Sequence, residues 1–166
     1  MPDSSAWLVE RLKTEGQKTL DYFQALPDAD CQIKIYTEGS HWTAHHILVH
    51  FVSAEIALGK LIDDIAEGGK GASPEFDINR FNESQVARMG SQTKADLLRQ
   101  FTEARSSNAI RVSRLLPSDL ERIGRHPYLG EASLEEIIKL IYRHNQIHQR
   151  DIRKTLSELS QRMFNE

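Results

Sequence analysis

Apolar residues recur every three or four positions in four long stretches of the chain, which is the spacing that places side chains on one face of an α-helix. The pattern predicts helices over residues 5–26, 41–67, 93–116 and 133–159. Helix-breaking residues support these limits, because Pro27, Gly68 and Pro117 follow the first three stretches. Ser133, with Glu136 three positions later, forms a capping box that begins the fourth helix.

The segments between these stretches carry little regular pattern. Residues 27–40 are predicted as a loop, because the alternation of two isoleucines there is too short to indicate a strand. Residues 68–92 form the longest connection and contain one short helix over 77–89, and residues 118–132 are predicted as another loop. A connection as long as 68–92 allows the helices on either side to run parallel rather than as a hairpin.

Four long amphipathic helices without a convincing strand are typical of an all-α fold, and specifically of a four-helix bundle. The chain of 166 residues has the length of one domain, so we expect residues 1–166 to form a single bundle domain. Its one cysteine, Cys31, has no second cysteine with which to form an internal disulfide, so the core has to hold the fold together.

Composition and charge exclude several functional classes. The 21 basic and 24 acidic side chains are interspersed and give a net charge of −3, without the basic face that nucleic-acid binding requires. No apolar run approaches the ~20 residues of a membrane span, and the N-terminus lacks a signal-peptide pattern. A lone cysteine fits a reducing compartment. We therefore expect a soluble, cytoplasmic protein with no nucleic-acid or membrane partner.

Three histidines occupy or border the apolar faces of the predicted helices. His144 and His148 are four residues apart and therefore lie one turn above each other, and His50 lies on the stripe of the second long helix. Burying three imidazoles together without partners would cost several kcal/mol. A divalent metal ion would satisfy them, and three histidine ligands leave a coordination position open for water or substrate, as in catalytic sites.

Other histidines are weaker candidates. His46 lies at the edge of the second stripe and is the one rival for a fourth ligand or a substrate-orienting group. His126 precedes a proline in a predicted loop that could reach the mouth of the bundle. His41 precedes the second long helix and His45 points away from its stripe, so we expect both to be solvated.

Alternative readings of these patterns remain open at this level. Histidines four residues apart also arise by chance, and a buried histidine is more often bonded to a carboxylate or carbonyl than to a metal. Asn108 falls on the stripe of the third long helix, where it can bond across helices or orient a ligand or substrate. Glu15 and Glu55 are expected to be solvated helix charges.

The order and spacing of these residues resemble the DinB/YfiT-like metalloenzymes. The resemblance rests on Trp42-Thr43 opening the second long helix, His50 eight residues after the tryptophan, and the HxxxH of His144 and His148. It implies up-down-down-up topology, with a long crossover between the second and third long helices, and a three-histidine site for a divalent ion, zinc or nickel. The family also implies a tendency to form homodimers.

The same resemblance implies the function that we expect. Family members include thiol-dependent transferases and the mycothiol-dependent maleylpyruvate isomerase domain. We therefore expect a divalent-metal-dependent enzyme that transfers a small-molecule thiol, an S-transferase whose partner is a low-molecular-weight thiol. The alternatives are a metal-dependent hydrolase and a non-catalytic, stress-associated bundle that binds metal or a small ligand. The sequence assigns no general base, and the catalytic residues beyond the metal ligands stay unknown.

Overall fold

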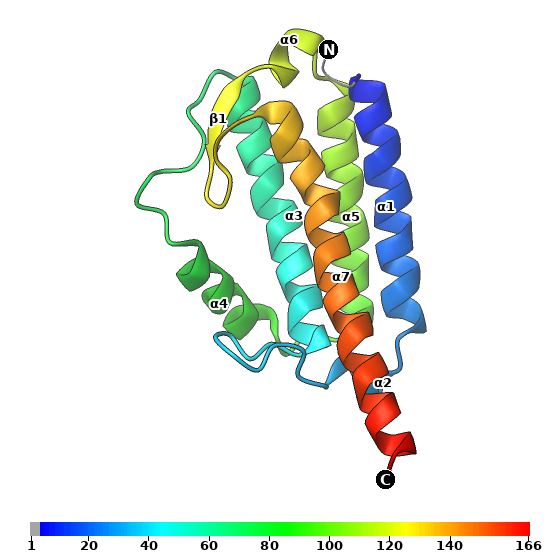
Figure 1. The fold of residues 1–166 in the computed structure, drawn as a ribbon. Helices are drawn as coiled ribbons and strands as arrows, with labels where there is room; N and C mark the ends of the chain where they lie inside the picture. Colours follow the sequence, from blue (N-terminus) through cyan, green and yellow to red (C-terminus); the bar gives the residue numbers. More distant parts are fainter. Residues whose placement is uncertain (1–3) are drawn as a thin grey trace.

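The computed structural model describes residues 4–166 and is built mainly of α-helices (Figure 1). The bundle consists of four long helices, α1 (Ser5–Ala25), α3 (Ala44–Ala66), α5 (Lys94–Ser113) and α7 (Leu134–Phe164). The connections contain shorter elements, namely α2 (Asp28–Cys31), α4 (Ile78–Met89), α6 (Pro117–Leu120), β1 (Ile123–His126) and β2 (Gly130–Ser133). The predicted all-α four-helix bundle is therefore confirmed.

The four long helices have the expected up-down-down-up topology. Figure 1 shows α3 and α5 running in one direction and α1 and α7 running in the other. The long connection from α3 to α5 carries α4 along the outside of the bundle and returns the chain to the end at which α3 began. A crossover of this length is what permits two consecutive long helices to lie parallel.

Each long helix begins at a hydroxyl side chain that accepts a hydrogen bond from a backbone N–H in the first turn. These caps are Ser4, Thr43, Thr93 and Ser133. The predicted helix starts follow from this chemistry and are correct to within a few residues. At its other end α5 stops at Ser113, earlier than predicted, because Pro117 begins the separate short helix α6 instead of ending α5.

Two of the predicted loops contain regular structure. The 27–40 segment includes α2, and the 118–132 segment includes α6 and a hairpin in which β1 pairs antiparallel with β2, Ile123 opposite Ser133 and His126 opposite Gly130. These four-residue strands lack an alternating apolar pattern, so the sequence did not indicate them. Gly124 of β1 lies directly against the Ile65 side chain of α3, which leaves no space for a Cβ and holds the hairpin on the bundle.

The buried side chains form two hydrophobic clusters with a polar layer between them. One cluster centres on Phe23, Phe51 and Phe101, and the other includes Leu12 and Ile138. Apart from His50, the buried polar residues of the long helices lie near the boundary between these two clusters. We call this set the polar layer, and it comprises Glu15, Thr19, Ser53, Glu55, Arg105, Asn108, Asn145 and Gln149.

A buried ion pair between α3 and α5 is the strongest contact in the polar layer. Arg105 donates from Nη2 to Glu55 Oε1 at 2.5 Å and from Nε to the same oxygen at 2.9 Å. Asn108 donates to the other carboxylate oxygen at 2.8 Å. The expectation that Glu55 is solvated is therefore wrong: its side chain is 2% exposed and fully paired. Periodicity shows only that a position is buried, and it gives no sign of a partner on another helix.

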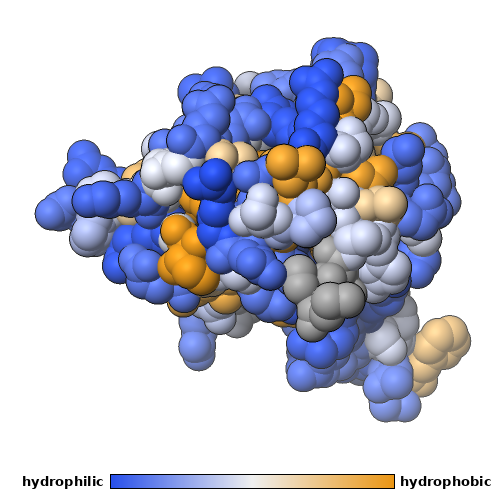
Figure 2. Space-filling view, turned by 90° about the horizontal axis from the view of Figure 1, so that it is seen from above, coloured by the Kyte–Doolittle hydropathy of each residue, from blue (hydrophilic) through white to orange (hydrophobic). Residues whose placement is uncertain are grey.

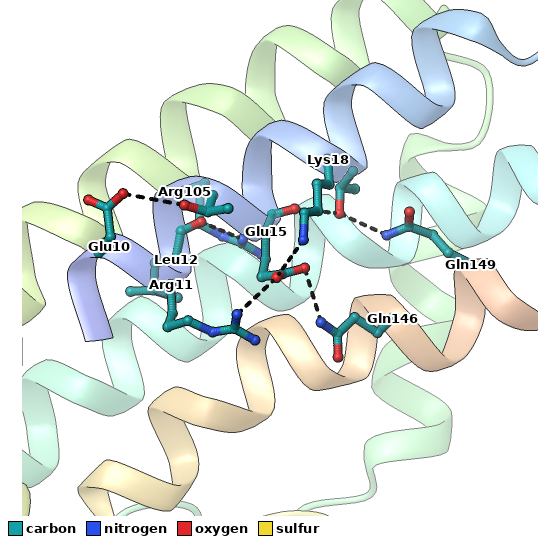
Figure 3. Close-up of polar contacts among 10 residues, drawn as sticks. Glu10, Arg11, Leu12, Glu15, Lys18, Arg105, Gln146 and Gln149 are labelled. Carbon is teal, nitrogen blue, oxygen red and sulfur yellow. Dashed lines mark hydrogen bonds and ion pairs between the residues drawn. The ribbon is translucent and has the colours of Figure 1, made fainter. Parts of the chain in front are cut away.

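Glu15 of α1 ties a second part of the polar layer to α7. Its carboxylate accepts from Gln146 at 3.0 Å and lies 3.1 Å from Lys18 and 3.3 Å from Arg11 (Figure 3). Burial alone would raise the pKa of Glu15, but hydrogen bonds from Gln146 and Lys18 and the nearby positive charges lower it overall. Glu15 is therefore buried and ionised rather than solvated as predicted.

Two helical glycines make room for the polar layer. A Cβ on Gly16 would lie 2.9 Å from Arg105 Cγ, and a Cβ on Gly59 would lie 2.5 Å from Asn108 Oδ1. Glycine inside a helix costs about 0.5–1 kcal/mol relative to alanine, so both positions trade helix propensity for close packing against polar side chains.

The surface view of the end that carries α6 and the hairpin shows mostly hydrophilic side chains, with apolar ones in separate groups (Figure 2). Exposed apolar residues of the molecule include Leu116, Ile123 and Tyr128. Among residues 4–166, no helix combines the length and the apolar character that crossing a bilayer requires.

Removing the charge of Arg105 should destabilise the fold strongly. We expect Arg105→Met to lower the free energy of unfolding by about 3–5 kcal/mol, because Glu55 would be left as an unpaired buried carboxylate. The double variant Arg105→Met/Glu55→Gln should recover part of this loss. Urea-induced unfolding followed by far-ultraviolet circular dichroism measures both.

The matched control is Arg99→Met on the same helix, where the arginine forms exposed ion pairs with Asp96 and Glu103. An exposed pair contributes at most about 1 kcal/mol, so this variant should unfold nearly as the parent does. Equal losses in Arg99→Met and Arg105→Met would show that the buried pair has no special role.

Candidate metal centre

Helices α3 and α7 bring three histidines together on their facing sides. His144 Nε2 lies 2.8 Å from His50 Nε2 and 3.0 Å from His148 Nε2. One nitrogen from each ring lies within 4.8 Å of the other two, so the group can hold a metal ion. Nitrogens that share a tetrahedral zinc ion at ~2.0–2.1 Å are roughly 3.4 Å apart, close to these separations. The structure thus brings together the three residues that the sequence singled out.

Burial keeps all three imidazoles neutral. It lowers the pKa of His50 to about 3, with the charge of His148 adding to the effect. Burial and the neighbouring charges of His50 and His148 lower the pKa of His144 well below its usual range, and burial lowers the pKa of His148. Neutral imidazole is the form that binds a metal, so the rings are in the competent state at neutral pH.

A chain of short polar contacts joins His148 to Tyr36 and Asp151. The Tyr36 hydroxyl donates to Asp151 Oδ2 at 2.7 Å and lies 2.6 Å from His148 Nδ1. Burial, followed by the hydrogen bond to Asp151 and its charge, raises the pKa of Tyr36, so the hydroxyl keeps its proton. The hydroxyl has one proton, and it donates that proton to the Asp151 carboxylate, which can only accept. The contact with His148 is therefore a hydrogen bond only if Nδ1 carries the proton, which leaves a lone pair on Nε2.

Hydrogen bonds alone do not satisfy the cluster. With a lone pair on His148 Nε2, its contact with His144 needs a hydrogen on His144 Nε2, whereas a hydrogen donated by His50 Nε2 would need a lone pair on that same atom, so separate hydrogen bonds cannot satisfy both contacts. His50 Nδ1 is buried and has no hydrogen-bond partner. A cation that accepts a lone pair from each of the three Nε2 atoms would satisfy those three atoms, with the proton of His50 left on its buried Nδ1. The donor set therefore fits a divalent ion of the kind that imidazole prefers.

The cluster is closed on one side and open on the other. His50 is buried at 6% exposure, whereas His144 and His148 are only partly buried. The aromatic ring of Phe51 packs against His144 and His148, with ring centroids 5.8 Å away in both cases. An ion held here would therefore have protein beneath it and access for a small molecule from the partly exposed side.

The tryptophan of the family motif supports His50 directly. The Trp42 ring lies 5.0 Å from the His50 ring, and its Nε1 is buried without a hydrogen-bond partner. The next residue, Thr43, caps α3 and so fixes where the helix begins. Trp42 therefore gives the His50 ring a surface to pack on. Thr43 fixes the start of the helix, and so the side of the helix on which His50 lies seven residues later.

The other predicted histidine candidates have different roles. His46 completes the capping box at the start of α3, where its Nδ1 accepts from Thr43 N at 3.2 Å, and it is not in the three-histidine group. His45, expected to be solvated, is partly buried and lies 3.0 Å from the carbonyl oxygen of Gly90. His41 is exposed as expected.

Asn108 belongs to the polar layer and not to the histidine cluster. Its amide nitrogen donates to the Glu55 backbone and carboxylate, and its oxygen accepts from Arg111 at 3.3 Å. These contacts make it a buried amide bonded across helices, which is the simpler of the two roles predicted. Its carbonyl and amide groups are both used, so neither is directed to a ligand of the cluster.

His126 lies close enough to influence the cluster. Its ring is 6% exposed, and its Nδ1 accepts from Tyr128 N at 3.0 Å and Leu129 N at 3.2 Å at the turn of the hairpin. Burial lowers the pKa of His126 to about 4, and a charge on this ring would lower the pKa of His144.

Sequence reasoning missed Tyr36 and Asp151. Asp151 lies three residues after His148 and so shares its helix face, which is a signal that the pattern contained. Tyr36 lies in a segment predicted as a loop, and no spacing rule connects it to a residue more than a hundred positions away.

The fold is a four-helix bundle with a three-histidine cluster between two of its long helices. The sequence matches the family model of the DinB superfamily over residues 11–152. The chain therefore belongs to the DinB superfamily, and the resemblance seen in its motifs is confirmed.

Solved structures with the same fold include three of special interest. The mycothiol-dependent maleylpyruvate isomerase superposes with a TM-score of 0.73 at 12% identity, covering 90% of this chain and 61% of that chain. YfiT from Bacillus subtilis, described as a probable metal-dependent hydrolase with an unusual four-helix bundle topology, has a TM-score of 0.75 at 17% identity, covering 96% and 87%. The four-helix bundle protein TT2238 has a TM-score of 0.60 at 13% identity, covering 89% and 99%.

These likenesses establish the fold. The chain spans about three-fifths of the length of the isomerase, so that protein has a part with no counterpart here. No curated protein sequence matches the chain at a significant level.

The buried state of His126 should make the metal-free protein less stable in acid. Its pKa falls from 6.5 when unfolded to about 4 when folded, so the unfolded state binds the extra proton between these values. The stabilisation is complete above pH 6.5 and is lost as the pH falls toward 4. Between pH 7 and pH 5 this single group should account for about 2 kcal/mol of the loss.

His126→Asn tests this, because an asparagine oxygen can still accept from the two turn N–H groups but does not titrate. Urea unfolding in the presence of a chelator should show a stability loss between pH 7 and pH 5 that is about 2 kcal/mol smaller than in the parent. Parallel pH profiles for parent and variant would contradict the assignment.

Proposed function

We propose that this protein is a divalent-metal-dependent enzyme in which His50, His144 and His148 hold the ion through their Nε2 atoms. The observation that carries the proposal is the convergence of three neutral imidazole nitrogens with no hydrogen bonds to satisfy them all. Zinc and nickel suit such a set, and three protein ligands leave a position for water or substrate. The DinB family membership supports the same conclusion.

When bound, a divalent ion supplies a Lewis acid that lowers the pKa of a water or thiol beside it. The residues of the chain do the remaining work. Trp42 and Phe51 pack against the imidazoles and exclude water from their inner side. Tyr36 and Asp151 hold the proton of His148 away from the side that faces the other two rings. A small molecule then approaches from the partly exposed side of α7.

For the reaction we propose transfer of a low-molecular-weight thiol to a small electrophilic substrate. The support is the fold shared with a mycothiol-dependent isomerase, together with an imidazole site of the kind that suits zinc or nickel, ions that also bind thiolate. A homodimer is proposed on family grounds.

A metal-dependent hydrolase is the second candidate. It is favoured by the superposition on YfiT, which extends over 87% of that chain rather than the 61% found for the isomerase. The same ligand set could also serve a bundle that binds metal without turnover, and the measurements below distinguish the three.

The protein purified without a metal-affinity tag or chelator should contain one divalent ion per chain, measured by plasma mass spectrometry. Adding zinc to the metal-free protein at a hundredfold excess over its dissociation constant should raise the free energy of unfolding by about 2.7 kcal/mol. His148→Ala should weaken zinc binding at least about a hundredfold, because loss of a ligand exceeds the ~10–100-fold cost of losing an outer partner.

The control is His41→Asn, which removes an exposed histidine whose backbone has φ of 53°, a conformation that asparagine tolerates. This variant should bind zinc as the parent does. A parent that binds less than stoichiometric metal, or a His148→Ala variant that binds it equally well, would contradict the metal site.

A thiol should bind the zinc-loaded protein at least about tenfold more tightly than its alcohol analogue, a difference of ~1.4 kcal/mol. Calorimetric titration with 2-mercaptoethanol and ethylene glycol measures this difference. A thiol transferase should also release halide from a chromogenic aryl halide in a saturable, thiol-dependent reaction. Saturable cleavage of an activated ester without thiol would favour the hydrolase, and no turnover of either substrate would favour the binding protein.

A further inference from the structure

The segment between α2 and α3 contacts two of the three histidines. Its Tyr36 hydroxyl lies 2.6 Å from His148 Nδ1, and its Trp42 ring packs against His50. The two contact residues are tied to each other, because Ile35 N and Tyr36 N both donate to the Trp42 carbonyl oxygen, at 2.8 and 3.2 Å. Backbone hydrogen bonds therefore hold the segment in one conformation beside the histidine cluster.

Tyr36 is oriented by a partner on the ligand helix itself. Its hydroxyl donates to Asp151 Oδ2, and Asp151 lies one turn after His148 on α7. The Tyr36 hydroxyl therefore lies between the His148 imidazole and the Asp151 carboxylate and contacts both. The Tyr36 and His148 rings meet edge to face, with centroids 5.8 Å apart. Ring packing and hydrogen bonding thus fix the same orientation of His148.

We propose that Tyr36 and Asp151 are positioning residues, which hold the His148 proton on Nδ1 so that Nε2 presents its lone pair to the ion. This inference rests on the proposed metal site and adds what sets the tautomer and the orientation of one ligand, His148. A ligating histidine whose far nitrogen donates to a fixed acceptor has one tautomer and one ring orientation, and loss of such an acceptor typically weakens metal binding ~10–100-fold.

The three proposed ligands are oriented by different contacts. His50 Nδ1 is buried and has no hydrogen-bond acceptor, so packing against Trp42 is what orients that ring. His148 alone among the three has a hydroxyl partner with a carboxylate behind it. The variants that separate hydrogen bonding from packing can therefore be made at His148 without disturbing His50.

Tyr36→Phe removes the hydroxyl oxygen that is proposed to accept from His148 Nδ1, and it keeps the aromatic ring. In metal-free protein labelled with ¹⁵N-histidine, the parent should show His148 as the Nδ1–H tautomer, and Tyr36→Phe should lose that preference. In competition with a chromophoric chelator, Tyr36→Phe should bind zinc ~10–100-fold more weakly than the parent. Asp151→Asn should change both quantities in the same direction by a smaller factor, because its amide oxygen still accepts.

The double variant tests whether the two residues act in one chain. Because Asp151 is proposed to act through Tyr36, Tyr36→Phe/Asp151→Asn should bind zinc no more weakly than Tyr36→Phe alone. Tyr22→Phe is the matched control, since it removes the hydroxyl of another partly buried tyrosine, whose ring lies under Arg153 away from the histidines. Its zinc affinity and its histidine spectrum should equal those of the parent.

The proposal is overturned if Tyr36→Phe keeps both the Nδ1–H tautomer and the zinc affinity of the parent. It is also overturned if Tyr36→Phe only lowers the unfolding free energy of the metal-free protein, since that is the effect of a structural contact. A parent that binds no zinc overturns the proposed function instead. In that case the tautomer measurement alone still decides whether Tyr36 sets the position of the His148 proton.

Discussion

Most polar side chains buried in the middle of this helical bundle bond to a neighbouring helix, and these bonds constrain the packing of the four long helices. Gln149 of α7 bonds to Thr19 of α1, and Glu55 of α3 bonds to Arg105 and Asn108 of α5. Such bonds fix the rotation of a helix about its own axis, because a shift of one residue turns each side chain by about 100°. His50 lies on α3, and His144 and His148 lie on α7. Because polar-layer bonds fix the rotation of both helices, they also direct the three rings toward each other.

The site is built from parts with different structural origins. Helical spacing alone places His144 over His148, and the tertiary packing of α3 on α7 brings His50 to them. An irregular segment then supplies the two aromatic residues that orient the rings, Trp42 and Tyr36. Long helices provide the three clustered histidines, while a non-helical segment held by its own backbone hydrogen bonds provides their support.

The accuracy of the sequence-based predictions followed from the range of the interactions involved. Helix starts were predictable because caps such as Ser133 act within one turn, and the three clustered histidines could be singled out because amphipathic spacing identifies buried positions. Glu15 and Glu55 were misassigned because their partners lie on other helices, and local pattern carries no information about those partners. The hairpin was missed for a similar reason, since the packing of Gly124 on α3 holds its short strands in place.

Gly16 and Gly59 imply a constraint on how this sequence can change over evolutionary time. Each glycine leaves a space that polar side chains fill, Arg105 beside Gly16, and Asn108 with Arg111 beside Gly59. A larger residue at either glycine collides with the polar side chain, and a smaller residue at the polar position leaves a void beside the glycine. Neither member of a pair can drift independently, so we expect these positions to covary among relatives and the polar layer to be gained or lost as a unit.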